Sequence, residues 1–288
     1  MVSIIILTYN SANYINKLLE SIVKFNKSSN YEIIVVDNNS EDETVKRVLS
    51  SKYKVLSIKL VQNSENFGFS KGINIGAKVA GGEYLLFINP DCEWSKGTTR
   101  EFVSIFEQDV KVGVVGGKIL AKNGVAEKSA GKFLKTLEVL LTALCLDEAF
   151  GVRLSPNKRC EVDFVSGGFM VVRKSLFEKF NGFDENLFLY VEDMEFCFRV
   201  KKSGLKVLFN PGVSAIHESH ASSNRSFAIE NIYKGLLYFH KKHGSGFSYK
   251  SVRNLLWAKA FALVLLGKII NNKDLTATYS RAFKVLNM

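Results

Sequence analysis

The sequence predicts an α/β protein with a mixed, mostly parallel sheet flanked by helices, followed by a helical extension. In the first half of the 288-residue chain, short apolar segments alternate with helical patterns, as in sheets whose strands are joined by helices. The apolar segments lack polar alternation, which is typical of strands buried on both faces. From about residue 227 the pattern is helical. We therefore expect an α/β domain over residues 1–224 and a basic helical extension over 225–288.

Local patterns predict the individual elements. The predicted strands are 3–8, 32–36, 55–61, 83–89, 112–118, 164–173, 206–209 and 213–217. The predicted helices of the α/β domain are 13–25, 40–49, 98–106, 174–180 and 192–202. Ser40 is expected to cap the second helix, and Gly204 to close the last. The stretch 120–160 is expected to hold a hairpin and a short helix around 137–150.

Charge and cysteine content narrow the setting. The net charge is +11, and residues 225–288 hold eleven Lys and Arg against two acidic residues. This tail is either a solvated helical surface or a contact for an anionic surface such as lipid headgroups. No recognised motif accompanies the charge, so nucleic acid is not an expected partner. The four cysteines form no C-x-x-C pair, and the apolar run 2–7 is too short for a signal peptide. A reducing cytoplasm is therefore expected.

The extension contains an apolar stretch, 255–270, that Lys259 and Lys268 interrupt. Its uninterrupted part is far shorter than the roughly 20 residues that a membrane span requires. The stretch is expected to be either a buried core helix or an interfacial helix with basic edges. The second alternative would place the protein on the cytoplasmic face of a membrane.

Polar residues follow two of the predicted strands. Asp37 ends the strand 32–36, at the edge where open α/β sheets bind ligands. Its carboxylate can accept the N3–H of uracil or thymine, or it can simply cap the next helix. The loop from Asn66 to Asn74, with Gly68 between them, opens a helix whose N-terminus suits a phosphate. It is not a dinucleotide or ATP-binding sequence, and a plain loop is the alternative.

A third strand ends at Asn89-Pro90-Asp91, with Glu93 two residues further on. Carboxylates in such a turn can hold a divalent cation that bridges to phosphates and neutralises a departing diphosphate. His217 ends another predicted strand and could complete this metal site. The string from His217 to His220 lacks the zincin spacing, and a lone histidine is more often structural.

Three acidic residues, Glu192, Asp193 and Glu195, open the predicted helix 192–202. Charge complementarity to the helix dipole is sufficient to explain them. The functional alternative is a general base that takes the proton of an attacking hydroxyl.

In this order the motifs resemble those of glycosyltransferase family 2, with its GT-A fold, and in particular its rhamnosyltransferase-like branch. The resemblance covers roughly residues 2–223. The motifs that carry it are Thr8-Tyr9-Asn10, Val36-Asp37-Asn38-Asn39-Ser40, Asn66-x-Gly68-Phe69 with Asn74 and Gly76, Asn89-Pro90-Asp91, Ser166-Gly167-Gly168, Gly182-Phe183-Asp184-Glu185, Phe188-x-Tyr190-x-Glu192-Asp193, Arg199 and His217. Three positions depart from the family pattern, namely Asn181, Glu93 and Glu195, and the last puts acceptor contacts in doubt.

The resemblance implies roles for individual residues. Asp37 would contact the nucleobase, Asp91 and His217 would hold Mg²⁺ or Mn²⁺, and Asp193 would be the catalytic base with Glu192 beside it. The other expected donor-binding residues are Thr8, Tyr9, Asn10, Asn39, Asn66, Gly68, Phe69, Lys71, Asn74 and Asn89. The other expected acceptor-side residues are Gly167, Gly168, Tyr190 and Glu195.

The expected activity is inverting transfer of rhamnose or another hexose from a dTDP- or UDP-sugar to a hydroxyl of a cell-surface glycan, with a glycan or a lipid-linked glycan as the acceptor. A sugar-nucleotidyltransferase could share the α/β layout, but no G-x-G-T-R-like phosphate loop follows the first strand. A non-catalytic glycan- or lipid-binding protein of the same fold is the other alternative. The presence of Asp91, Asp193 and His217 counts against it.

Overall fold

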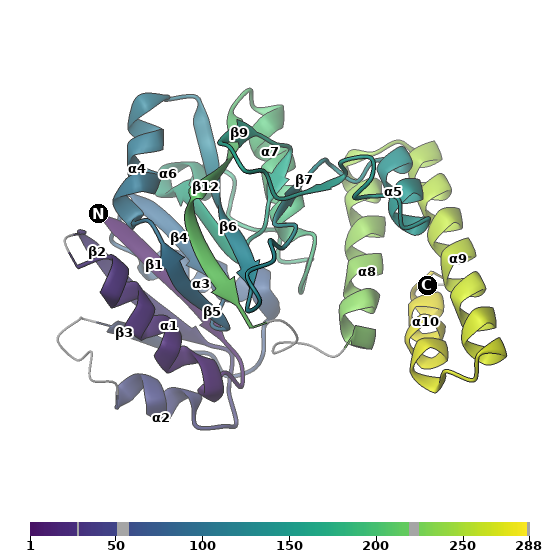
Figure 1. Cartoon of the computed structure of the whole chain (residues 1–288), viewed down its shortest axis with the longest axis horizontal. Coiled ribbons are helices and arrows are strands. Elements are labelled where there is room, and N and C mark those ends of the chain that lie inside the picture. Colours follow the sequence, from purple (N-terminus) through teal and green to yellow (C-terminus); the bar gives the residue numbers. More distant parts are fainter. Residues whose placement is uncertain (28, 51–57, 219–224, 287–288) are drawn as a thin grey trace.

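A computed structural model describes residues 1–27, 29–50, 58–218 and 225–286 of the chain. A mixed sheet forms the centre, helices lie against it, and the C-terminal helices stand together to one side (Figure 1). The predicted fold class is therefore confirmed.

The main sheet has nine strands within the described residues, in the order β3-β2-β1-β4-β11-β6-β12-β5, with β9 paired to β12. Its strands are β1 (Val2–Thr8), β2 (Tyr31–Asp37), β3 (Ile58–Gln62), β4 (Tyr84–Ile88), β5 (Cys92–Lys96), β6 (Val112–Ala121), β9 (Cys160–Glu161), β11 (Phe169–Arg173) and β12 (Lys206–His217). A small antiparallel sheet contains β7 (Ala130–Gly131), β8 (Arg153–Leu154) and β10 (Phe164–Val165). The strands β3, β2, β1 and β4 run parallel, whereas β11 is antiparallel to both β4 and β6.

The sheet separates two hydrophobic cores because neighbouring side chains of a strand point to opposite faces. In β6, Val114 belongs to one core and Val115 to the other. The first core includes Ile73, Phe177 and Phe196, from the helices on one face. The helices on that face are α3 (Gly68–Val79), α6 (Lys174–Lys179) and α7 (Glu192–Lys202). The second core takes its side chains from α1 (Ala12–Phe25) and α4 (Thr99–Gln108). Both sides of β1, β2 and β4 are therefore buried, as the apolar segments predicted, whereas the edge strand β3 has no buried residue, contrary to the expectation.

Some predicted boundaries were wrong. The segment 164–173 is two strands, β10 and β11, because the chain turns between them with a hydrogen bond from Phe169 N to Ser166 O of 3.2 Å. The segments 206–209 and 213–217 form the single strand β12, with a change of register between Asn210 and Ser214. The strand β5, which pairs with β12, was not predicted. Residues 55–57 of the predicted strand 55–61 and His220 lie outside the described residues.

Two helices are shorter than predicted. The helix expected over 40–49 is α2 (Thr44–Leu49), and its N-cap residue is Glu43. Ser40 is not the cap because its hydroxyl donates to Asp37 Oδ1 at 2.6 Å. The helix expected around 137–150 is α5 (Thr136–Ala143), which is followed by Cys145 in a left-handed conformation, φ 58°.

The helical extension consists of α8 (Arg225–His243), α9 (Gly246–Ile269) and α10 (Lys273–Val285). These helices pack on one another, and α5 lies against α9 (Figure 1). Side chains of the extension, among them Leu236, Leu256 and Ala282, belong to the same core as α7. None of the helices in the described part of the chain has the length and apolar character needed to span a bilayer.

Candidate active site

A cavity of about 600 Å³ lies beside the ends of β1 and β4 and the beginnings of α3 and α7. Parallel strands bring the residues that follow them to one edge of the sheet, where this fold class binds ligands. Many predicted site residues line the cavity: Thr8, Tyr9, Asn66, Gly68, Phe69, Asn89, Asp91, Gly167, Gly168, Tyr190, Glu192 and Asp193. The predicted site residues that do not line it are Asn10, Asp37, Asn39, Lys71, Asn74, Glu195 and His217.

Asp91 follows β4 and is only 4% exposed. Neither of its carboxylate oxygens accepts a well-formed hydrogen bond from the described residues. His217 Nε2 lies 3.4 Å from Asp91 Oδ2, at the outer limit of such a bond. A buried carboxylate without hydrogen bonds is costly, so it typically serves a ligand. Glu93, by contrast, is exposed on β5 and does not line the cavity.

The Asp91–His217 pair fits a divalent cation. Carboxylate oxygens suit Mg²⁺ and Mn²⁺, imidazole nitrogen is a common metal ligand, and substrate phosphates complete many such sites. The described residues contain no cluster of three or more such protein ligands. On its other side His217 Nδ1 lies 3.0 Å from Glu127 Oε2, which fixes the ring as a carboxylate behind a metal-binding histidine does. The pKa of His217 is raised to about 9. The contact with Asp91 is the main cause, burial acts in the opposite direction, and the charge of Glu127 raises the pKa further.

Asp37 organises the loops at the end of β2. It is 1% exposed, and its Oδ1 accepts hydrogen bonds from Thr8 Oγ1 at 2.8 Å and Ser40 Oγ at 2.6 Å. Its Oδ2 accepts one from Ser40 N at 2.8 Å. A carboxylate oxygen has two acceptor positions, so Oδ2 can accept one more hydrogen bond. The nucleobase contact of Asp37 therefore stays a prediction. Its neighbour Asn38 does line the cavity.

The beginning of α3 touches the loop that precedes α7. Gly68 has φ 80°, and an added Cβ there would collide with Phe188 O. Phe69 N donates a 2.6 Å hydrogen bond to the same Phe188 oxygen. A glycine is required at this point because the turn is left-handed and the approach is close. The predicted phosphate loop and the predicted acceptor loop are thereby held together.

Four predicted donor residues lie outside the cavity. Lys71 Nζ lies 3.7 Å from the centre of the Phe67 ring, and Asn39 is exposed. Asn10 Oδ1 accepts from Glu41 N at 2.9 Å, which ties two loops together. Asn74, 6% exposed, binds the backbone of residue 183 through both ends of its amide.

Glu192, which is buried, and Asp193, which is half-buried, form a carboxylate pair in the cavity. Burial, and then the charge of Asp193, raise the pKa of Glu192 well above its usual value. Burial also raises the pKa of Asp193. Asp193 Oδ2 accepts a 3.0 Å hydrogen bond from Gly167 N and Oδ1 accepts a 2.7 Å bond from Met194 N, whereas Glu192 Oε2 has no partner among the described residues. Hydrogen bonds to the charged form favour ionisation, so Asp193 is the member that ionises and Glu192 the member that keeps a proton.

Replacing Glu192 by glutamine should stabilise the protein at neutral and alkaline pH. In the unfolded chain Glu192 loses its proton near about pH 4.3, whereas in the folded protein it keeps it. Stability therefore falls as the pH rises above the unfolded value, because the unfolded state then binds fewer protons. Glutamine has no proton to lose in this pH range, so the variant does not lose stability in this way. The gain in melting temperature over the wild type should grow between about pH 5 and 8, and a gain that is the same at both ends would contradict the assignment.

Glu195 was predicted to lie on the acceptor side, but the structure places it elsewhere. It is 0% exposed and forms a bidentate pair with Arg199, whose Nε donates to Oε1 at 3.1 Å and whose Nη2 donates to Oε2 at 2.8 Å. Lys242 Nζ and His243 Nε2, both from α8, reach Glu195 Oε1 at 2.8 and 2.9 Å. Its carboxylate therefore joins α7 to α8 and does not face the cavity.

The sequence analysis missed several cavity residues. The missed residues are Leu7, Ser11, Asn38, Pro90, Ser166, Phe188, Leu189 and Phe227. Four of them belong to motifs noted in the sequence, which could have indicated them: Asn38, Pro90, Ser166 and Phe188. Phe227 carries no local signal, because it comes from the helical extension. Its ring meets Phe188 edge to face, with centroids 6.0 Å apart.

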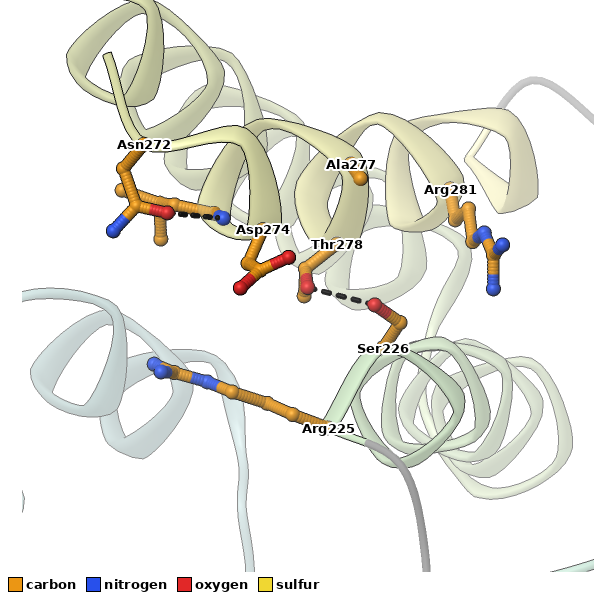
Figure 2. A pocket seen from close by; sticks show the side chains of 8 residues that line it. Arg225, Ser226, Asn272, Asp274, Ala277, Thr278 and Arg281 are labelled. Carbon is orange, nitrogen blue, oxygen red and sulfur yellow. Dashed lines mark hydrogen bonds between the residues drawn. The ribbon is translucent and has the colours of Figure 1, made fainter. Parts of the chain in front are cut away.

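A second cavity, of about 550 Å³, lies between α8 and α10 (Figure 2). Ser226 and Thr278 are hydrogen-bonded across it at 2.7 Å. Asn272 caps α10 by accepting from Leu275 N at 2.9 Å. These polar groups hold the helices together, so we assign the chemistry to the first cavity, where the carboxylates are.

Comparisons with known proteins identify the family of the chain. The family model described as glycosyl transferase family 2 matches residues 3–180. Rhamnosyltransferase WbbL of Escherichia coli K12 is 29% identical over 244 residues, covering 79% of this chain and 86% of the relative. The N-acetylglucosaminyl-diphospho-decaprenol L-rhamnosyltransferase of Mycobacterium tuberculosis is 23% identical over 243 residues, covering 77% of each chain.

Solved structures share the fold. GalNAc-T7 with UDP, GalNAc and Mn²⁺ matches 99% of this chain and 55% of its own, with a TM-score of 0.65 and 16% identity. Residues 1–349 of Staphylococcus aureus TarS match 99% of this chain and 90% of their own, with a TM-score of 0.54 and 20% identity. The fold and site define a GT-A glycosyltransferase. The chain belongs to glycosyl transferase family 2 and is rhamnosyltransferase-like.

Proposed function

We propose that the protein transfers a sugar, with inversion, from a dTDP- or UDP-sugar to a hydroxyl of a cell-surface glycan. The observation that carries this proposal is that Asp91 and the Glu192–Asp193 pair line one cavity. Asp91 would serve the diphosphate and Asp193 the acceptor. Curated relatives named rhamnosyltransferases support rhamnose as the sugar. Structural neighbours in complex with UDP, or with GDP-mannose and Mn²⁺, support a nucleotide-sugar donor and a divalent metal.

The proposed reaction is a single displacement. Asp193 takes the proton of the acceptor hydroxyl, and the oxygen attacks the anomeric carbon as the bond from that carbon to the nucleoside diphosphate breaks. The hydrogen bond from Gly167 N holds Asp193 in place during this step. Glu192, which keeps its proton, adds no second negative charge beside the base. A divalent cation held by Asp91 and His217 would neutralise charge on the departing diphosphate.

Donor binding should depend on Asp91. Isothermal calorimetry with UDP, dTDP and GDP, with and without Mn²⁺, should show binding of the pyrimidine diphosphates that requires the metal. Asp91→Asn removes the charge that holds the cation, so it should weaken metal-dependent binding by at least about tenfold.

Glu93→Gln is the matched control, because Glu93 is two residues away but exposed and outside the cavity. This variant should bind the pyrimidine diphosphates with the same metal-dependent affinity as the wild type. Wild-type affinity that is equal with and without metal would contradict the metal site. Strongest binding by GDP would contradict the assignment of a pyrimidine donor.

The extension is proposed to touch an anionic membrane surface, where a lipid-linked acceptor would be found. Besides Phe247 at its start, which is 80% exposed, α9 exposes five large apolar side chains further along: Trp257 by 42%, Phe261 by 52%, Leu265 by 51%, Leu266 by 43% and Ile269 by 73%. We call these five residues the α9 patch. Lys250, Arg253, Lys268 and Lys273 are exposed on or beside α9. Apolar side chains with a basic surround suit the boundary between headgroups and acyl chains.

The double variant Trp257→Ser, Phe261→Ser should lose binding to anionic vesicles, because it removes the two stacked rings of the α9 patch. Flotation with phosphatidylglycerol vesicles should recover the wild type, and higher salt or phosphatidylcholine alone should reduce recovery. Val110→Ser is the control, since Val110 is 80% exposed but lies in the α/β domain. Equal flotation of the double variant and the wild type would rule out the α9 patch as the contact.

A further inference from the structure

The chain adopts an unusual conformation immediately before the catalytic helix. Tyr190 has φ 68° and Val191 has φ 73°, so two consecutive residues other than glycine are left-handed. A β-branched residue rarely takes this conformation, because its side chain crowds the backbone. Such a corner persists only where the surrounding structure holds it. We call residues 190–191 the left-handed corner.

This corner sets the start of α7. Val191 O accepts a 2.8 Å hydrogen bond from Glu195 N, in the first turn of the helix. Glu192 and Asp193 follow directly and line the cavity. A change at the corner would therefore move the carboxylate of Asp193 relative to Gly167 N, its hydrogen-bond donor at 3.0 Å.

Helix α8, from the extension, packs on the corner at Gly235. A methyl group at Gly235 would lie 2.8 Å from Val191 Cγ2, 2.9 Å from Val191 Cβ and 3.2 Å from Tyr190 O. Only glycine allows α8 to come this close to the corner. Val191 is 9% exposed beneath it.

Other residues of α8 hold the segments on both sides of the corner. Tyr238 and Lys242 follow Gly235 by three and seven positions, so all three lie on one helix face. Before the corner, Tyr238 Oη donates to Asp184 Oδ2 at 2.7 Å and Lys242 Nζ reaches the same oxygen at 2.6 Å. After the corner, Lys242 Nζ reaches Glu195 Oε1 at 2.8 Å.

We propose that Gly235 of α8 is a positioning residue for the catalytic base. It lets α8 pack closely on the left-handed corner, which holds the corner in its conformation and thereby fixes the position of the Asp193 carboxylate. The catalytic part of this inference rests on the proposed function of Asp193. The extension is then part of the catalytic unit, beyond any contact with a membrane. Its face at Gly235, Tyr238 and Lys242 serves the active site, whereas its α9 patch is exposed.

Gly235→Ala tests the contact. Alanine is the better helix former, so α8 itself should not suffer. Hydrogen exchange at the Glu195 amide should nevertheless become faster by on the order of tenfold, while the strands of the main sheet keep their protection. Gly246→Ala is the matched control in α9, since an added Cβ there has nothing within 4 Å. In this variant the Glu195 amide should exchange at the wild-type rate.

Val191→Gly supplies the rescue, because it removes both side-chain atoms that the new methyl group would meet. The double variant Gly235→Ala, Val191→Gly should return the Glu195 amide to the exchange rate of Val191→Gly alone. Unchanged exchange in Gly235→Ala would overturn the proposal. So would a loss of protection that spreads evenly over the sheet, or one that Val191→Gly does not reverse.

The catalytic part is tested by hydrolysis of dTDP-rhamnose, in which water replaces the acceptor hydroxyl, gives its proton to Asp193 and takes the rhamnosyl group as dTDP is released. Gly235→Ala should lower kcat by on the order of tenfold and leave the donor KM unchanged, because the donor side is untouched. Fast exchange at Glu195 together with wild-type turnover would overturn the positioning role. If even the wild type released no dTDP, the proposed donor would be wrong, and the exchange data alone would decide whether Gly235 seats the corner.

Discussion

Asp193→Asn should lower the rate of sugar transfer by about 10² to 10⁴, the usual effect of removing a general base, with donor affinity nearly unchanged. The amide cannot take the proton of the acceptor hydroxyl. Its oxygen can still accept the hydrogen bond from Gly167 N, so the loop beside it should stay in place. Measuring kcat for transfer and the donor Kd on the same preparation separates a loss of chemistry from a loss of binding.

Glu192→Gln is the control for this result. Because Glu192 keeps its proton in the folded protein, the neutral amide resembles its normal state, and the variant should retain most of its turnover near neutral pH. If Asp193→Asn kept more than about a tenth of wild-type turnover while Glu192→Gln was inactive, Glu192 would be the base. Normal turnover in both variants would contradict the acceptor side of the proposed function.

The order of strands and helices explains which site residues the sequence could reveal. Thr8 is the last residue of β1 and Asp91 comes three residues after the end of β4. Parallel strands deliver such residues to one edge of the sheet. Gly68 could be predicted in the same way, because it opens a helix after a strand. For these residues the position along the chain already fixes the position in the fold.

Residues whose partners are distant in sequence could not be predicted. Glu195 stands among acidic residues at a helix start, which indicates either a dipole interaction or catalysis. Its partners Lys242 and His243 are 47 and 48 residues away, and only the packing of α8 on α7 brings them to it. Phe227 lines the cavity for the same reason. A helical pattern shows which face of α8 is apolar, but not where the helix packs.

Hydrogen bonds of single polar side chains also changed two expectations. Ser40 fits the pattern of a helix cap, yet its hydroxyl is used by Asp37, and the helix begins four residues later at Thr44. Asn74 fits a phosphate loop, yet it holds the backbone of Phe183. In both cases a polar side chain satisfied a buried partner, which residue type alone does not indicate.

Glu195→Ala should destabilise the protein by about 3–5 kcal/mol, the range found when one partner of a buried ion pair is removed. Burial raises the pKa of Glu195, but the hydrogen bonds and charges of Arg199, Lys242 and His243 outweigh burial and hold it below its usual value. The carboxylate is therefore ionised, and removing it leaves Arg199 and Lys242 without their shared acceptor. Urea unfolding of the variant and the wild type gives the difference in free energy of unfolding.

Glu230→Gln is the matched control, because Glu230 pairs with Lys234 at 2.7 Å on the exposed side of α8. An exposed pair contributes only about 0–1 kcal/mol, so this variant should unfold nearly as the wild type does. The contribution of Glu195 should also depend on pH. Its pKa is lower in the folded state, so its stabilisation is present above the unfolded pKa and is lost as the pH falls below it. The difference in free energy of unfolding between Glu195→Ala and the wild type should therefore become smaller at acidic pH. A gap that is constant with pH, or as small as that of Glu230→Gln, would show that this carboxylate does not hold α8 to α7.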